Sequence, residues 1–303
     1  MEKLPHRFFC LIFFLFFISA CNTGEGKTTS INTVLPQSTI VKKNETIGVS
    51  PVPSPSEPKA ITTPIPTTAL LKLPDGELSV VAIGDSLTQG DGDESGKDGY
   101  PSRLAELIGP KRAGTTILNL GKSGWSSTDV LAGVNGEEPT LPKALAAKPK
   151  ITLIWIGSND LWYLYEYGPE PMTAEAEDQD LAVYTANIDK MLSQLTSDGS
   201  MVFIALLDDQ SKRPVVANPP NPSEPAFSAI TAADLERMSV HVVAMNEIIK
   251  KEAALHRSVY VDFYNTDIFT NSNTLYSDGN HPNTTGYEKI AGIWFTAIEP
   301  YLH

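Results

Sequence analysis

The sequence predicts an α/β fold over residues 73–303, with a parallel sheet between two layers of helices. Short apolar runs recur along this part of the chain, and longer stretches between them carry apolar residues at helical spacing. The runs are apolar throughout, which is typical of parallel strands covered on both faces. Because strands that alternate with helices form right-handed βαβ units, the pattern favours a three-layer α/β/α sandwich.

Five apolar runs are expected to form the strands of this sheet. They cover residues 78–83, 116–120, 151–156, 201–207 and 259–263. Three other stretches carry an apolar stripe with steps of three and four residues, which predicts amphipathic helices. These stripes cover residues 181–195, 235–249 and 287–301.

The N-terminus has the layout of a bacterial secretion signal. Lys3 and Arg7 precede an apolar run over residues 8–18, which is shorter than the roughly 20 residues of a membrane-spanning helix. The letters Ile-Ser-Ala-Cys that end at Cys21 resemble a lipobox, in which the cysteine is acylated. We therefore expect a signal peptide over residues 1–20 and a lipid on Cys21. An ordinary signal peptide, which would leave a secreted protein, is the alternative.

Residues 21–72 are expected to form a tether that begins at the lipidated cysteine. They are rich in Thr, Ser and Pro, and they contain too few large apolar residues to bury a core. The folded domain would then begin at residue 73, outside the cytoplasm, anchored to the bacterial cell membrane or cell surface. A leader without any role is the alternative for this segment. Cys10 and Cys21 are the only cysteines, so no disulfide is expected in the domain.

The charge of the chain restricts its partners. The formal net charge is -13, and no basic cluster follows the N-terminus, so the sequence argues against binding to nucleic acid. An acidic surface also gives no attraction to anionic lipid headgroups, so membrane contact is expected only through the lipid anchor. We expect the domain to be a monomer.

Polar residues that can take part in catalysis or binding follow four of the five apolar runs. Because the carboxyl ends of parallel strands meet at one edge of a sheet, these segments are expected to lie together there. They are Gly-Asp-Ser-Leu at 84–87, Asn-Leu-Gly-Lys-Ser-Gly at 119–124, Gly-Ser-Asn-Asp at 157–160 and Asp-Gly-Asn-His-Pro at 278–282.

These segments contain the groups that acyl transfer to a serine requires. A serine hydroxyl becomes a nucleophile when an imidazole takes its proton and a third group orients the imidazole. Asp278 and His281 are three residues apart around a glycine, so one loop can present both to Ser86. The backbone N–H groups of Ser86 and Gly124, with the side chain of Asn159, would stabilise the oxyanion. A side chain at position 124 would obstruct the approach of a substrate.

The four segments resemble the four motif blocks of the SGNH (GDSL-type) hydrolases, in family order, and the resemblance covers residues 76–303. It implies a flavodoxin-like sheet of strand order 2-1-3-4-5, no metal or other cofactor, and hydrolysis of acyl esters. It also implies that Ser86 is the nucleophile, His281 the base and Asp278 its orienting partner, with Gly124 and Asn159 as oxyanion donors. The Gly-x-Ser-x-Gly elbow of the α/β-hydrolases is absent.

The expected function is that of a serine esterase that hydrolyses acyl esters through an acyl-enzyme. The substrate could be an acylated carbohydrate, a lysophospholipid or another small ester. Two alternatives stay open at this stage. One is a tethered lipoprotein that binds a glycan or solute without turnover, and the other is an acyltransferase that uses the same residues.

Several other segments have more than one structural interpretation. Residues 91–98 loosely resemble a calcium loop, although a solvated acidic turn beside the catalytic pocket is favoured. The aromatic residues within 162–167 could line a substrate cleft or pack in the core. The Pro-rich stretch 208–225 could be a lid or a surface loop. His241 and His256 are expected to be surface or core positions without a catalytic role.

Overall fold

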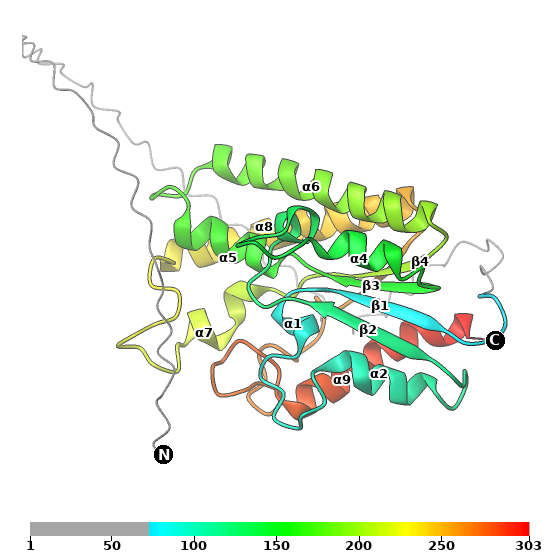
Figure 1. The fold of residues 1–303 in the computed structure, drawn as a ribbon. Coiled ribbons are helices and arrows are strands. Elements are labelled where there is room, and N and C mark those ends of the chain that lie inside the picture. Colours follow the sequence, from blue (N-terminus) through cyan, green and yellow to red (C-terminus); the bar gives the residue numbers. More distant parts are fainter. Residues whose placement is uncertain (1–72, 303) are drawn as a thin grey trace, which may run out of the picture. The chain divides into compact units, whose positions relative to one another are not determined.

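The computed structural model describes residues 73–302, which form a five-stranded parallel sheet with helices on both faces (Figure 1). The strand order is β2-β1-β3-β4-β5, and every neighbouring pair is parallel. The strands are β1 (Ser79–Gly84), β2 (Thr116–Gly121), β3 (Ile151–Trp155), β4 (Met201–Ala205) and β5 (Val259–Val261). The predicted α/β sandwich and its strand order are confirmed.

The longer helices form two layers, one on each face of the sheet (Figure 1). One layer contains α2 (Tyr100–Ile108) and α9 (Thr284–Ile298). The other contains α3 (Ser127–Ala132), α4 (Thr140–Ala146), α5 (Ser158–Tyr167), α6 (Ala174–Ser197) and α8 (Ala232–Leu255). The short segments are α1 (Ser86–Gln89), η1 (Gln210–Lys212), α7 (Pro214–Ala217) and η2 (Glu299–Tyr301).

The predicted helical stripes form the buried faces of α6, α8 and α9. Their buried members include Tyr184, Ile188 and Met191 in α6, and Met238 and Met245 in α8. The fully buried side chains of this kind contribute about 1.5–3 kcal/mol each to folding, before the cost of ordering them.

An aromatic cluster joins the sheet to the α2 and α9 layer. The ring of Trp155, on β3, stacks on Phe263 with centroids 4.2 Å apart and meets Trp294 of α9 edge-on at 6.3 Å. Tyr100, the first residue of α2, stacks on Trp294 at 5.8 Å. Both helices are therefore fixed against the sheet close to the ends of its central strands.

Two of the five predicted apolar runs differ from the expectation of a strand that is buried along its whole length. Along β2 the side chains of Thr116 and Leu118 are exposed, because no helix covers the outer part of this edge strand. The run at 201–207 also leaves the sheet early, after Ala205. Leu207 is nevertheless buried, and its N–H donates to the side chain of Asn246 on α8 at 2.8 Å instead of to a neighbouring strand.

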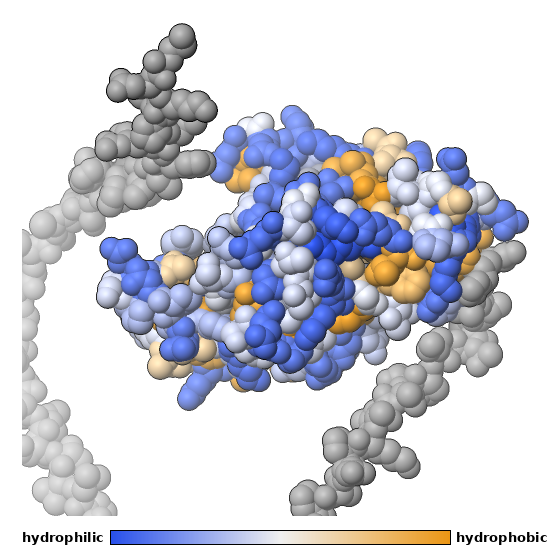
Figure 2. All heavy atoms as spheres, turned by 90° about the horizontal axis from the view of Figure 1, so that it is seen from below, coloured by the Kyte–Doolittle hydropathy of each residue, from blue (hydrophilic) through white to orange (hydrophobic). Residues whose placement is uncertain are grey.

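The face of the domain formed by α2 and α9 is largely hydrophilic (Figure 2). Apolar side chains appear there in separated patches rather than in one continuous area. None of the helices within residues 73–302 has the length and apolar character needed to cross a bilayer. The predicted signal peptide, the tether and Cys21 lie outside the described residues.

Candidate active site

Ser86 lies at the sharp turn that joins β1 to α1. Asp85 caps this helix, because its Oδ1 accepts the N–H of Leu87 at 2.9 Å. The turn is possible only with glycine at position 84, since a Cβ there would collide with Thr88 and with the carbonyl of Trp155. As the first residue of α1, Ser86 keeps an N–H without an intrahelical acceptor.

The structure brings Ser86, His281 and Asp278 together. The Oγ atom of Ser86 lies 3.0 Å from Nε2 of His281, and Nδ1 of the same ring lies 2.6 Å from Oδ2 of Asp278. Because Nδ1 faces a carboxylate, it is the nitrogen that donates, and Nε2 is left to accept the Ser86 hydroxyl proton. The three groups are therefore in the order that activates a serine hydroxyl.

Backbone N–H groups of the loop at residues 278–282, here called the catalytic loop, hold the Asp278 carboxylate in its charged form. Its Oδ1 accepts the N–H groups of Asn280 at 2.8 Å and His281 at 3.0 Å. Partial burial raises the pKa of Asp278, but the bonds from the His281 ring and these two N–H groups lower it further, to below its usual value. The carboxylate consequently stays ionised and keeps orienting the imidazole through the neutral pH range.

The expected oxyanion donors lie at the same edge of the sheet. Gly124 follows β2, and no backbone acceptor within residues 73–302 takes its N–H. The Nδ2 of Asn159, in the first turn of α5, donates to the carbonyl of Trp125 at 2.9 Å. An amide nitrogen carries two hydrogens, so this bond orients the side chain and leaves the second hydrogen for a ligand.

Position 124 requires glycine because of its backbone conformation as well as for the approach of a substrate. Its φ is +77°, in the left-handed region, and its carbonyl accepts a hydrogen bond from the hydroxyl of Tyr163. A Cβ at this position would lie 3.3 Å from that hydroxyl. The sequence predicted a glycine for substrate approach, and the structure adds the positive φ, which glycine adopts without strain.

Gly124→Ala should lower kcat by about 10²-fold with a smaller change in KM, because it tilts one oxyanion donor. The matched control is Gly199→Ala, which carries a similar strain (φ of +90°) but has open space around its Cβ and lies just before β4, at the opposite end of the strands from Ser86. Steady-state kinetics on p-nitrophenyl acetate and far-UV circular dichroism separate the two effects. Equal losses in both variants would contradict the role of Gly124 in the site.

A buried arginine donates a hydrogen bond to the catalytic loop. Arg213 is 1% exposed, and its guanidinium donates to both oxygens of Asp208 at 2.8 and 2.6 Å. It also donates to Oδ1 of Asn280 at 2.8 Å and lies 4.3 Å over the ring of Phe269. No local sequence pattern indicates the role of Arg213, because its partner Asn280 is 67 residues away.

The stretch 208–225 is therefore not one lid or one surface loop. Its first half is packed under the catalytic loop, where the N–H of Val215, in α7, donates to the carbonyl of Gly279 at 3.0 Å. Most residues within 217–224 are exposed. The part of this stretch nearest the triad acts as a support.

The acidic segment 91–98 is exposed at residues 94–98, as the favoured solvated turn predicts, and differs from that prediction at Asp93. Asp93 is buried, and its carboxylate is 2.5 Å from the guanidinium of Arg103, with further donors from Ser95 and the N–H of Gly99. Although burial raises it, these partners hold the pKa of Asp93 well below its usual value. Its oxygens are occupied, as a calcium loop would not allow. The segment does border the site, since a Cβ on Gly92 would lie 2.9 Å from that of His281.

The aromatic residues of α5 divide between core and surface. Trp162 and Tyr165 are buried, and Trp162 stacks on Phe227 with centroids 4.4 Å apart. Tyr163 and Tyr167 are 40% and 77% exposed. Only these last two are therefore available to a substrate.

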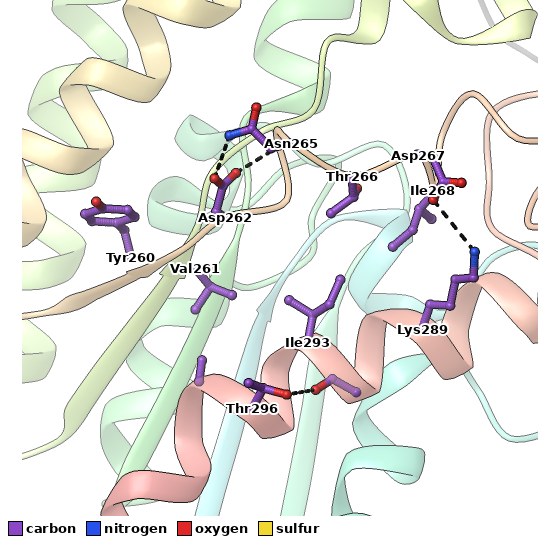
Figure 3. A pocket seen from close by; sticks show the side chains of 12 residues that line it. Tyr260, Val261, Asp262, Asn265, Thr266, Asp267, Ile268, Lys289, Ile293 and Thr296 are labelled. Carbon is purple, nitrogen blue, oxygen red and sulfur yellow. Dashed lines mark hydrogen bonds and ion pairs between the residues drawn. The ribbon is translucent and has the colours of Figure 1, made fainter. Parts of the chain in front are cut away.

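A cleft of about 440 Å³ lies beside Gly124 and Tyr163. Its other lining residues are mostly polar: Ser123, Trp125, Ser126, Thr128, Asp129, Val134, Asn135 and Glu137. A wider groove of about 930 Å³ lies between β5 and α9 and contains none of the expected site residues (Figure 3). Of these two cavities, only the cleft is lined by an expected site residue, Gly124, and Ser86, His281 and Asn159 are not among its lining residues.

Two buried carboxyl groups lie under the site. Burial raises the pKa of Asp85 to about 6, against the lowering effects of the Leu87 N–H and the Arg213 charge, and its Oδ2 has no partner among the described residues. Asp160 accepts the N–H of Ser127 at 2.8 Å and also its hydroxyl, but burial still raises its pKa to about 7.

The stability of the domain should fall as the pH rises from about 4 to 7. In this window the folded protein binds a proton on Asp160 that the unfolded chain has released, so raising the pH favours unfolding. The contribution is complete below the unfolded pKa and is lost as the pH passes the folded pKa of about 7.

Asp160→Asn should reduce the slope of this pH dependence and leave the part that comes from Asp85, whose folded pKa of about 6 is also raised. An asparagine can accept the Ser127 N–H and donate to its hydroxyl, so the hydrogen bonds are kept while the titration is removed. Asp178→Asn, an exposed change on α6, is the control and should leave the slope unchanged. Urea unfolding midpoints at pH 5, 6, 7 and 8 provide the measurement, and an unchanged slope in Asp160→Asn would contradict this assignment.

Fold and site together define a domain of the ester hydrolase class. Residues 82–289 match the model of the GDSL-like lipase/acylhydrolase family, so the chain belongs to that family. It is 24% identical over 265 residues to a multidomain esterase of Ruminococcus flavefaciens, covering 78% of this chain and 30% of that protein. It is 25% identical over 229 residues to an acetylxylan esterase of Xylanibacter ruminicola, covering 73% of this chain and 43% of that protein.

The fold is similar to that of solved esterases. A catalytic mutant of an acetylxylan esterase from Geobacillus stearothermophilus superposes with a TM-score of 0.51 at 18% identity, covering 74% of this chain and 95% of that one. This similarity supports the sandwich architecture. The chain spans less than half of the two curated relatives described above.

Proposed function

We propose that this protein is a serine esterase that hydrolyses short acyl esters of carbohydrates. The observation that carries the proposal is the continuous hydrogen-bonded path from Ser86 Oγ through His281 to the Asp278 carboxylate, with distances of 3.0 and 2.6 Å. A binding protein without turnover has no use for such a path, because binding does not require an activated hydroxyl.

In the proposed mechanism, Nε2 of His281 takes the proton of Ser86 as Oγ attacks the acyl carbonyl carbon. The negative charge on the carbonyl oxygen is stabilised by the N–H groups of Ser86 and Gly124 and by Nδ2 of Asn159. His281 then gives its proton to the departing alcohol, which leaves an acyl group on Ser86. Water, activated by His281, releases the acid in the second half of the cycle.

The chemistry of the cleft favours a hydroxyl-rich alcohol. The half-exposed ring of Tyr163 offers a flat apolar surface beside polar side chains, including Asn135 and Asp129. An aromatic face with nearby hydrogen-bonding groups suits a sugar ring, whereas a long acyl chain needs an apolar channel. The similarity to proteins named acetylxylan esterases points to the same class of substrate.

A panel of esters, with matched variants, tests the proposal. Wild-type protein should release acetate from acetylated xylo-oligosaccharides with a higher kcat/KM than that for p-nitrophenyl decanoate or a lysophospholipid. Asn135→Gly removes a cleft side chain at a φ of +53° that glycine tolerates, and it should raise KM for the oligosaccharide only. p-Nitrophenyl acetate, which lacks the sugar, is the control substrate.

The products distinguish the remaining alternatives. Release of free acetate in water supports a hydrolase. Acetyl groups that move to an added alcohol without free acetate would favour an acyltransferase. Unchanged ester after long incubation with folded protein would contradict both and favour a binding protein.

We further propose that the domain works outside the cytoplasm, tethered through a lipid on Cys21. The support for this is the signal-like sequence over residues 1–20 and the Ser, Thr and Pro-rich composition that follows it. A soluble secreted form is the alternative location.

A further inference from the structure

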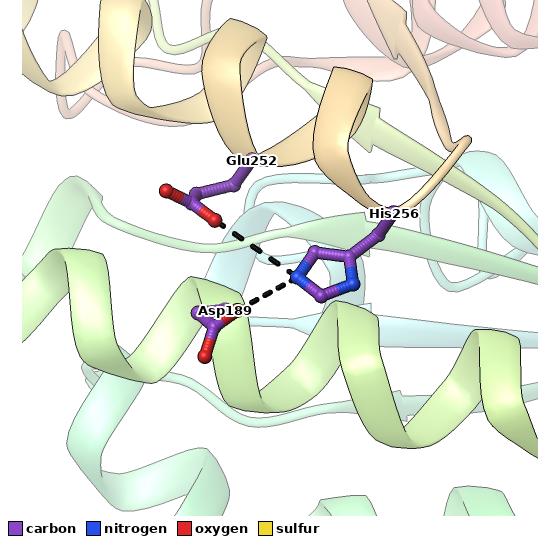
Figure 4. A group of neighbouring side chains, drawn as sticks. All are labelled: Asp189, Glu252 and His256. Atoms are coloured by element: carbon purple, nitrogen blue, oxygen red, sulfur yellow. Dashed lines mark hydrogen bonds and ion pairs between the residues drawn. The ribbon is translucent and has the colours of Figure 1, made fainter.

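A second cluster of chemically active side chains lies far from Ser86 along the strands. Ser86 follows the carboxyl end of β1, whereas His256 caps the C-terminus of α8 just before the amino end of β5. Asp189 of α6 and Glu252 of α8 face the ring of His256 (Figure 4). Within residues 73–302 this is the one group in which three carboxylate or imidazole ligand atoms lie within 4.8 Å of one another.

Both carboxylates approach the same nitrogen of His256. Its Nε2 lies 2.7 Å from Oδ1 of Asp189 and 3.9 Å from Oε2 of Glu252. A ring nitrogen carries at most one hydrogen, and the shorter distance shows that Asp189 receives it. One hydrogen on Nε2 therefore satisfies one carboxylate and leaves the other without a donor.

Glu252 is the group without a donor, and it is buried. Its side chain is 5% exposed, and no donor among the described residues makes a hydrogen bond to it. The nearest cationic nitrogens are 3.8 Å away on Lys251 and 3.9 Å away on His256. An ionised carboxylate is costly to bury without a hydrogen bond or a bound cation.

We propose that Asp189, Glu252 and His256 bind one divalent transition-metal ion, with Zn²⁺ as the best match. One imidazole nitrogen and two carboxylate oxygens are ligands that Zn²⁺ accepts, whereas Ca²⁺ and Mg²⁺ prefer oxygen alone. His256 and Asp189 are partly open to solvent, so an ion can enter and water can complete its coordination. The ion would join α6 to α8.

The geometry requires only small movements. Zinc bonds of about 2.0–2.2 Å place tetrahedral ligand atoms roughly 3.3–3.5 Å apart. The distances from Nε2 of His256 to Asp189 and Glu252, 2.7 and 3.9 Å, lie on either side of that value. Side-chain movements of about 1 Å therefore bring the three ligand atoms onto one ion. Glu252 and His256 are four residues apart and share one helix face. The C-terminal end of α8 also attracts positive charge.

Zinc binding should raise the thermal midpoint of the full chain. After treatment with EDTA and its removal, ZnCl₂ at about 100 times its dissociation constant should increase Tm by about 5–10 °C. Calorimetric titration should show one ion per chain. MgCl₂ and CaCl₂ at the same concentration should shift Tm much less. Hydrolysis of p-nitrophenyl acetate at 25 °C should be the same with and without zinc, because the ion lies away from the triad.

The matched variants are His256→Gln and His241→Gln. His241 also bridges α8 to α6, 2.8 Å from Asp180, but no third ligand from residues 73–302 is grouped with it. His256→Gln should lose most of the zinc shift, and Glu252→Gln should behave in the same way, whereas His241→Gln should keep it. No shift in the wild type, or an equal shift in His256→Gln, would overturn the proposal. These readings do not depend on esterase activity, so they stand or fall separately from the proposed function.

Discussion

Ser86→Ala should reduce kcat for p-nitrophenyl acetate by about 10⁴–10⁶-fold and leave the fold intact. The change removes the atom that lies 3.0 Å from Nε2 of His281, and no neighbouring hydroxyl is placed to replace it in the described triad. Losses of this size follow removal of a serine nucleophile from comparable triads. Since the Ser86 side chain caps nothing and fills little volume, thermal unfolding should change by less than about 1 kcal/mol.

The same experiment has a direct chemical readout. A fluorophosphonate probe should label the wild-type chain once, on the peptide that contains Ser86, and should fail to label Ser86→Ala. Ser223→Ala, an exposed serine in the stretch after α7, is the control and should keep both activity and labelling. Hydrolysis that survives in Ser86→Ala at more than a few per cent would contradict the assignment.

Arg213→Met should lower the free energy of unfolding by about 3–5 kcal/mol. The guanidinium and the Asp208 carboxylate are 1% and 5% exposed, so the substitution leaves a buried negative charge without its partner. It also removes the donor to Asn280, within the loop that carries Asp278 and His281. kcat should therefore fall together with stability, and KM should change less.

Two comparisons make this result specific. Arg237→Met breaks a more exposed pair with Glu177, 38% and 18% exposed, and should cost less than about 1 kcal/mol. The double variant Arg213→Met with Asp208→Leu removes both buried charges and should be more stable than Arg213→Met alone. Urea unfolding measures all three. A double variant no more stable than the single one would show that the buried charge is not the cause.

The sequence predicted the strands and the site segments for one physical reason. Buried parallel strands must be apolar on both faces, and ligand-binding residues in such sheets follow the strand ends. Ser86, Gly124 and Asn159 each follow a different strand, so their approach to one another could be expected from topology alone. Asp278 and His281 are local in sequence, and one turn presents both.

The residues that hold the catalytic groups in place could not be predicted. Their partners are distant in sequence, or the composition around them indicates a different environment. Arg213 resembles any arginine in a Pro-rich stretch until the fold places it against Asn280. Asp93 belongs to an acidic run that indicates solvent exposure, yet Arg103, ten residues away, makes it a buried anchor. The positive φ of Gly124 depends on a carbonyl held by Tyr163, which no local pattern encodes.

The distance along the chain between Ser86 and His281 has a consequence for how activity emerges. They are 195 residues apart, and α9, which begins at Thr284, is held to the loop after α1 by the Tyr287 hydroxyl, which donates to the Asp91 carbonyl at 2.7 Å. A chain still being synthesised could complete the sheet before its base is in place. Such a nascent protein would not hydrolyse esters. In a refolding experiment, the return of hydrolysis would therefore report when the segment that carries His281 and α9 docks.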